Sequence, residues 1–159
     1  MKKVNILLRP AIAFLVLISC PLYAAETTKY TGTVYARPVK HLMPLGNGDA
    51  VLAIELAGIV ALSDNPPTLG ALVCTGMGLQ KADNSTSTDF YCNLKQNDED
   101  SFDFKGNAAE TTDGKSKGSF DVVGGSGKWA NATGKGKFKR LMKTDTGTKT
   151  VIEIEITTP

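Results

Sequence analysis

Glu55 is the residue whose setting comes nearest to that of a catalytic acid or base. It lies in an otherwise apolar segment, Ala50 to Leu62, and shares one strand face with Ala53 and Ala57. If that face lines an enclosed space, Glu55 is a buried carboxylate suited to proton transfer or to polarising a ligand. If the face meets solvent, Glu55 is an ordinary surface charge. Because buried, unpaired glutamates are rare, the solvent-facing interpretation is favoured and Glu55 is a weak catalytic candidate.

The other residues that could ligate a metal or attack a substrate form no recognisable site. The oxygen-rich run from Asn97 to Asp100 could collect calcium, but it lacks the glycine and the distal glutamate of an EF-hand loop, so a solvated turn is favoured. His41 is the single histidine and has no carboxylate or nucleophile near it in sequence. Two thiols and one histidine do not complete a zinc site. We therefore expect no metal and no cofactor, and we favour a function other than catalysis.

A targeting signal at the start of the chain sets the compartment in which these residues act. Three basic residues, Lys2, Lys3 and Arg9, precede an apolar run from Ile12 to Ile18 that is too short to span a bilayer. Pro21-Leu22-Tyr23-Ala24 then leads into a small-residue cleavage site before Ala25. We interpret residues 1–24 as a cleaved export signal. The remaining 159 − 24 = 135 residues, 25–159, have the size of a single domain, which we expect in the periplasm or outside the cell.

The same segment also permits a second interpretation, as a lipoprotein signal. Leu17-Ile18-Ser19-Cys20 resembles a lipobox, in which Cys20 would be lipidated and would anchor the protein to a membrane. The apolar residues after Cys20 differ from the usual polar tether, so the unanchored form is favoured. We expect contact with a membrane only if Cys20 is lipidated.

The charge balance argues against a nucleic-acid partner. The signal holds three of the 18 basic residues and none of the 16 acidic ones, so residues 25–159 carry 15 basic and 16 acidic residues, a net charge of −1. Such a domain has no long-range field that would gather a polyanion.

Cys74 and Cys92 are predicted to form a disulfide. Export places them in an oxidising compartment, and Cys20 is either removed or capped, which leaves these two as a pair. Both lie in strand-like segments, separated by the polar turn from Lys81 to Ser87. The midpoint of 74 and 92 is residue 83, inside that turn, so the two cysteines should face each other across an antiparallel hairpin.

Short alternating segments dominate the rest of the domain and predict an all-β fold. Helical periodicity is absent after the signal, and about eight short strands at this spacing are typical of a sandwich or a barrel. Gly58 suggests a bulge or bend within its strand, and the proline- and glycine-containing segment from Arg37 to Asp49 suggests the longest loop. The expected strands cover residues 30–35, 50–62, 68–79, 88–94, 101–105, 118–123, 136–143 and 151–157.

The stretch from Phe120 to Gly136 is the most distinctive in the sequence. Its letters Gly125-Ser-Gly-Lys-Trp-Ala130 match a dinucleotide-binding fingerprint, but no helix pattern follows, so the match is due to chance. Between two strands, however, GGSGKWANATGKG resembles the signature of barrel proteins related to allene oxide cyclase and the plant dirigent proteins, and small secreted bacterial proteins with this hairpin are similar.

This resemblance covers about residues 90–140 and implies an eight-stranded antiparallel barrel, in agreement with the strand count. It also implies that the glycines supply positive backbone angles and that Trp129 covers one end of the barrel. A ligand-stacking role for Trp129 is the weaker alternative, because such aromatic residues are more often simply packed.

These features favour a non-catalytic exported barrel that binds a small apolar ligand or an envelope protein. A cyclase- or isomerase-like enzyme of the allene oxide cyclase or dirigent type is the first alternative, because such a barrel can hold a reactive intermediate with few visible catalytic residues. A structural envelope protein is the second alternative.

Overall fold

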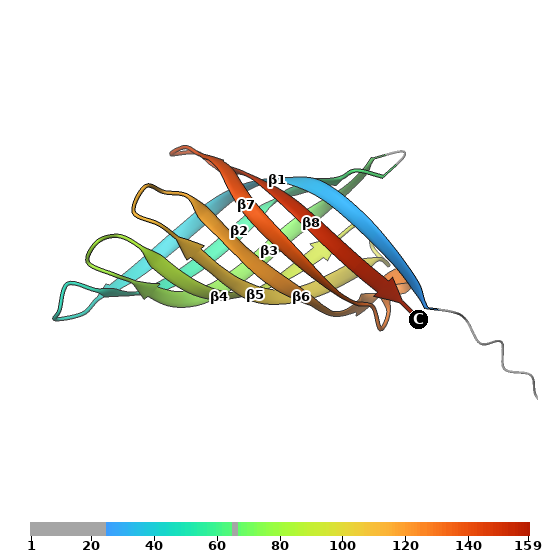
Figure 1. The fold of residues 1–159 in the computed structure, drawn as a ribbon, viewed down its shortest axis with the longest axis horizontal. Helices are drawn as coiled ribbons and strands as arrows, with labels where there is room; N and C mark the ends of the chain where they lie inside the picture. Colours follow the sequence, from blue (N-terminus) through green and yellow to red (C-terminus); the bar gives the residue numbers. More distant parts are fainter. Residues whose placement is uncertain (1–24, 65–66) are drawn as a thin grey trace, which may run out of the picture.

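The computed structural model describes residues 25–64 and 67–159, so the predicted signal peptide and Cys20 lie outside the described residues. The described chain forms a closed barrel of eight antiparallel strands, in which successive strands pair and β8 pairs back onto β1 (Figure 1). The predicted all-β, eight-stranded antiparallel barrel is confirmed. The strands are β1 Glu26–Pro44, β2 Ala50–Leu62, β3 Thr68–Gln80, β4 Thr86–Lys95, β5 Ser101–Glu110, β6 Ser116–Ser126, β7 Thr133–Lys143 and β8 Thr148–Thr158.

Side chains alternate across the barrel wall, so each strand contributes one face to the core and one to the surface. In β5, for example, Phe102 and Phe104 are buried while Asp103 and Lys105 are exposed. In β8, Ile154 and Ile156 are buried between exposed glutamates. The sequence alternation that predicts strands therefore also predicts which residues form the core.

Phenylalanine rings inside the barrel lie over glycines of the neighbouring strand. Phe120 pairs with Gly136, where an added Cβ would lie 2.1 Å from the ring. Phe138 pairs with Gly118, where the corresponding distance is 2.5 Å. An eight-stranded barrel has an interior just wide enough for side chains or one small ligand, and these glycines make room for the rings within that width.

The segment from Arg37 to Asp49 is not a long loop, which corrects the sequence-based prediction. Its first eight residues continue β1 to Pro44 and pair with β2, and only residues 45–49 form the connection. The pairing of β1 with β8 ends at Ala36, so Pro38 lies where β1 has a partner on one side only. Proline lacks a backbone N–H and is tolerated on such an edge.

Gly58 does not form the predicted bulge. The register between β2 and both of its neighbours continues without a shift past this residue. An added Cβ would lie 2.3 Å from the carbonyl oxygen of Tyr35 and 2.6 Å from the Cβ of Ala36. Gly58 therefore permits a close approach of β1 rather than a change of register.

The glycine-rich stretch forms the connection between β6 and β7, where η1 (Gly127–Trp129) is a single 3-10 turn. Gly124, within β6, and Gly127, in η1, have positive φ angles of 148° and 58°, whereas Gly134 and Gly136, within β7, do not. No helix among the described residues is long and apolar enough to cross a membrane.

The two ends of the barrel differ in what they carry. Because the strands run up and down, the β2–β3, β4–β5 and β6–β7 connections lie at the same end as the start of β1 and the end of β8 (Figure 1). We call this end the Trp129 end. The β1–β2, β3–β4, β5–β6 and β7–β8 connections lie at the opposite end, which we call the loop end.

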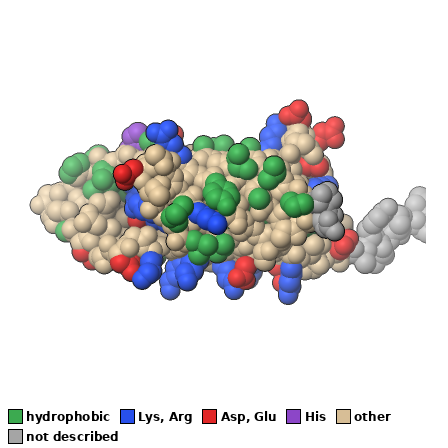
Figure 2. Space-filling model, turned by 90° about the horizontal axis from the view of Figure 1, so that it is seen from above, with side chains coloured by type: hydrophobic (Ala, Val, Ile, Leu, Met, Phe, Trp, Pro, Cys, Tyr) green, Lys and Arg blue, Asp and Glu red, His purple; other side chains and the backbone are tan. Residues whose placement is uncertain are grey.

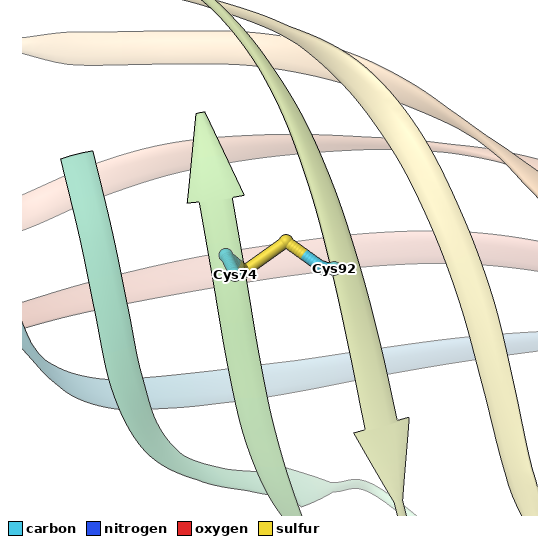
Figure 3. Close-up of a disulfide and its surroundings, with 2 residues drawn as sticks. All are labelled: Cys74 and Cys92. Atoms are coloured by element: carbon cyan, nitrogen blue, oxygen red, sulfur yellow. A yellow bond between two sulfur atoms is a disulfide. The ribbon is translucent and has the colours of Figure 1, made fainter. Parts of the chain in front are cut away.

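The predicted disulfide between Cys74 and Cys92 is confirmed. The two residues are direct partners on β3 and β4, with Cα atoms 4.0 Å apart and a bond between their sulfur atoms (Figure 3). Cys92 is buried and both cysteines line the barrel interior. The bond therefore fastens neighbouring strands in the middle of the hairpin.

The outer surface is divided between apolar and charged strands. Large hydrophobic side chains of β1, β2 and β3 are exposed, whereas the outward residues of β7 and β8 are mainly lysine and glutamate. Figure 2 shows hydrophobic side chains gathered over the middle of one face, with charged side chains along its edge. The exposed apolar residues of these three strands include Tyr35, Val39, Ile59, Leu69, Val73 and Met77.

Candidate functional site

The barrel interior holds a cavity of about 150 Å³. Its wall is mostly aliphatic and aromatic, and includes Leu52, Leu72, Phe90 and Phe138. An apolar cavity of this size can admit a benzene-sized molecule. The interior can therefore hold one small apolar group.

The Trp129 end of the barrel is sealed by packing and hydrogen bonds. Trp129 is 5% exposed and packs edge-to-face against Tyr30 and Phe102, with ring centroids 6.0 and 5.5 Å apart. Its indole N–H donates to Oε1 of Gln96 at 3.0 Å. Phe102 lines the cavity and Trp129 lies behind it, so Trp129 closes the barrel and does not belong to the cavity wall.

Asp100 holds the seal in position from the β4–β5 turn. Its Oδ1 accepts a hydrogen bond from the backbone N–H of Lys128 at 2.9 Å, and its Oδ2 accepts one from the side chain of Asn97 at 2.9 Å. These hydrogen bonds hold the pKa of Asp100 below its ordinary value, and the bond from Lys128 has the largest effect. The run from Asn97 to Asp100 is thus a hydrogen-bonded turn, and no cluster of metal-binding residues occurs among the described residues.

The loop end carries a buried carboxylate with three cations. Glu110, whose side chain is 9% exposed, has Oε1 2.6 Å from Nζ of Lys143 and Oε2 3.1 Å from Nη1 of Arg140. Nζ of Lys40 lies 3.5 Å from the same Oε2. We call these four residues the Glu110 cluster. Lys40, Glu110 and Arg140 line the cavity, so the cluster forms the polar end of an otherwise apolar interior.

Glu110 is ionised at neutral pH. Burial alone would raise the pKa of Glu110, but hydrogen bonds from Lys143 and Arg140, together with the charges of Arg140 and Lys40, outweigh that effect and hold its pKa below the ordinary value. Three cations then surround one anion, and the cluster carries a net charge of +2. An excess of positive charge at the end of an apolar cavity is the main electrostatic feature of the interior.

A β-bulge in β7 places Lys143 in this cluster. Inward side chains of β7 fall on even-numbered residues up to Arg140, which pairs with Thr150. The register then shifts, and Lys143 pairs with the buried Thr148. The extra residue turns Lys143 inward and leaves Met142 exposed, in keeping with the way bulges redirect side chains near functional sites.

Two residues singled out from the sequence lie outside the cavity. Glu55 is exposed on the outer face of β2, between Val39 of β1 and Thr75 of β3. This exposed position is the one expected for Glu55, because buried, unpaired glutamates are rare. His41 is exposed on the outer side of β1 and pairs with Ala53. Neither residue can reach a molecule held inside the barrel.

None of the four members of the Glu110 cluster was predicted from the sequence. Three of them continue an inward alternation that the sequence displays: Glu110 follows Phe102 and Phe104, Arg140 follows Phe138, and Lys40 follows Val34 and Ala36. Extending each strand by parity would have placed them inside. Lys143 carries no such signal, because only the bulge turns it inward.

Comparison with known proteins adds no family assignment, since neither a protein-family model nor a curated protein matches this chain.

Proposed function

We propose that this protein is an exported barrel that binds a small apolar ligand in its interior, without catalysing a reaction on it. The observation that carries the proposal is the apolar cavity of about 150 Å³, enclosed by all eight strands and sealed at the Trp129 end. The Cys74–Cys92 disulfide is compatible with an oxidising, extracytoplasmic compartment. The resemblance to the allene oxide cyclase and dirigent barrels agrees with this architecture and stays part of the proposal.

A catalytic role finds less support inside the barrel. Glu55, the carboxylate that suggests a cyclase- or isomerase-like enzyme, is on the outer surface. Glu110 does face the cavity, but its lowered pKa and its three cationic partners make it a weak proton acceptor. The interior is thus better suited to holding a molecule than to moving a proton.

Two alanines of β5 provide a matched test of interior binding. Ala108 lines the cavity, and its neighbour Ala109 is exposed on the outer surface. We expect a neutral, benzene-sized probe such as fluorobenzene, followed by its fluorine resonance, to bind saturably, Ala108→Leu to abolish most of that binding by filling the cavity, and Ala109→Leu to leave it unchanged. Equal loss in both variants, or no saturable binding to the unaltered protein, would contradict interior binding.

Native mass spectrometry of protein purified from its own source tests the same proposal without an artificial probe. We expect a fraction of the protein to carry an additional small, apolar mass that Ala108→Leu removes. Protein that never carries such a mass, together with failure of the probe to bind, would overturn the proposed function.

One observation supports a second function, assembly with another protein. The exposed apolar side chains of β1, β2 and β3 are more numerous than the isolated hydrophobic residues that are normal on a protein surface. If this face binds a second copy of the chain, light scattering of the purified protein should show an oligomer that Val73→Lys dissociates. A monomer at every concentration would count against self-assembly.

A further inference from the structure

We propose that the Glu110 cluster binds the acidic head group of a small amphipathic organic anion whose apolar part occupies the cavity. The inference rests on the proposed function and adds the chemical class of the ligand: a carboxylate, or a similar monoanion, on an apolar ring or chain of about six carbon atoms. That size follows from a cavity comparable to one that admits benzene.

The first support for this proposal is the imbalance of charge. Glu110 neutralises one of its three cationic neighbours, which leaves two positive charges at the end of the cavity. The acidic residues of the loop-end connections, Asp49, Asp83, Asp113 and Asp145, do not line the cavity. Asp113 is itself paired with Lys115. Arg140, the most buried of the three cations at 15% exposure, shares its one carboxylate partner with two lysines, and a ligand anion would supply a second partner.

The second support is the number of hydrogen-bond donors that the cluster retains. Within the described part of the chain, Arg140 contacts both Oε2 of Glu110, at 3.1 Å, and the carbonyl oxygen of Gly114, at 3.4 Å, through Nη1. A guanidinium has five N–H donors, so those of Nη2 and Nε remain able to bind an anion. Nζ of Lys40 makes a long contact of 3.5 Å with Oε2 of Glu110, so Lys40 can turn to a second acceptor.

The third support is the position of the cluster between the apolar cavity and the solvent. Arg140 is 15% exposed, Lys40 is 28% exposed and Lys143 is 44% exposed, so exposure rises in steps towards the loop end. Hydroxyl groups of Thr88 and Ser116, both buried, line the same part of the cavity and can also donate hydrogen bonds. An amphipathic anion can therefore leave its apolar part among the aromatic rings and place its charge at the cluster.

Three ligands that share one ring and differ in charge test the inference. Calorimetric titration at low salt would compare cyclohexanecarboxylate, cyclohexylmethanol and cyclohexylmethylamine. We expect the carboxylate to bind roughly tenfold more tightly than the alcohol, because hydrogen bonds to charged groups are stronger than those between neutral groups, and the amine to bind most weakly. The preference for the carboxylate should decrease as salt is added.

Variants of β7 test whether the preference for the carboxylate over the alcohol comes from the Glu110 cluster. Arg140→Gln should remove most of the tenfold preference, whereas Lys139→Gln, an exposed neighbour of Arg140 on the outer surface, should leave it intact. Lys143→Gln should reduce the preference by a smaller factor and, as the most exposed member, provides a second test if Arg140→Gln does not fold.

Glu110→Gln should change the affinity for the carboxylate ligand in the opposite direction. Without the carboxylate the cluster has three unneutralised cations, so the carboxylate ligand should bind more tightly to this variant and raise its melting temperature more than that of the unaltered protein. A purely structural role of Glu110 would instead weaken the binding of all three ligands equally.

Each result separates the inference from the function on which it rests. Equal affinity for the carboxylate and the alcohol would overturn the head-group site and leave interior binding in place. Preference for the amine would overturn it too, since Glu110 would then be the recognising group. Failure of all three ligands to bind, combined with failure of fluorobenzene to bind, would overturn both proposals.

Discussion

The two ends of the barrel close the same interior by opposite chemistry. At the Trp129 end, an indole ring packs against Tyr30 and Phe102, and its polar atom is paired with Gln96. At the loop end, four charged side chains face the cavity or border it, and their charges do not balance. The first arrangement is what stability alone would favour, because it buries apolar area and satisfies its polar atom.

The Glu110 cluster is harder to explain by stability. A buried ion pair contributes little net free energy, and an apolar replacement of similar volume is often as stable. Proteins keep such locally unfavourable arrangements mainly where function requires them. The difference between the ends thus predicts that substitutions at the Trp129 end change stability most, whereas substitutions at the loop end change stability less and change ligand preference.

Trp129→Ala should have the largest effect on stability. Removing a buried tryptophan leaves a void in the seal and is expected to lower the free energy of unfolding by about 3 to 5 kcal/mol. Urea denaturation followed by far-ultraviolet circular dichroism would measure it. Lys128→Ala, which removes only an exposed cation 5.0 Å from the same ring centroid, should cost less than about 1 kcal/mol. A small effect of Trp129→Ala would show that the ring does not seal this end.

Loss of the disulfide should rank second. Cys74 and Cys92 are 18 residues apart, and the chain-entropy model assigns about 3 kcal/mol to a loop of this length. The double variant Cys74→Ala, Cys92→Ala should lose about this much, and reduction of the unaltered protein should give a similar loss. Binding of an apolar ligand at low temperature should persist in both. Unchanged stability after reduction would contradict a stabilising role for the bond.

Glu110→Gln should cost about 2 kcal/mol at neutral pH, since it removes charge-assisted hydrogen bonds from a buried position. Because the pKa of Glu110 is lowered in the folded protein, this stabilisation is fully present above the ordinary glutamate pKa and is lost as the pH falls through the folded value. The difference in unfolding free energy between the two proteins should therefore shrink as the pH is lowered from 7 to 3. A difference independent of pH would argue against the ionised carboxylate.

Lys143→Gln should have the smallest effect on stability, below about 1 kcal/mol, because its side chain is 44% exposed and solvent screens the pair. Thermal unfolding of this variant beside Arg140→Gln would sharpen the comparison of the ends. A loss from Lys143→Gln as large as that from Trp129→Ala would mean that the loop end also exists for stability.

The core of the barrel was predictable from the sequence because the alternation of apolar and polar residues and the residues typical of turns indicate the same strands there. Residues 50–62 were predicted with the bounds that β2 has, and the turn around residue 83 placed Cys74 opposite Cys92. Strand ends were predicted poorly. Residues 106–109, Gly-Asn-Ala-Ala, have low strand propensity, so the predicted strand stopped at Lys105 and Glu110 was left outside it.

Lys40 and Lys143 were missed for a related reason, since their places in the cluster depend on strand pairing that local sequence does not encode. Pro38 suggested a loop because prolines are rare in paired strands. Its position is an edge only because β8 pairs with β1 no further than Ala36. The inward turn of Lys143 requires a register shift between β7 and β8. Long-range pairing, rather than residue type, brings these side chains together.

Chemical-shift mapping tests the central claim, that the barrel binds its ligand inside, most directly. Neutral cyclohexylmethanol would be titrated into isotopically labelled protein while backbone amide resonances are followed. We predict saturable shifts centred on cavity-lining residues such as Thr88, Ala108 and Phe138, and little change at the outward Glu55 and Val73. Shifts confined to the outer face of β1 to β3, or shifts that never saturate, would contradict interior binding.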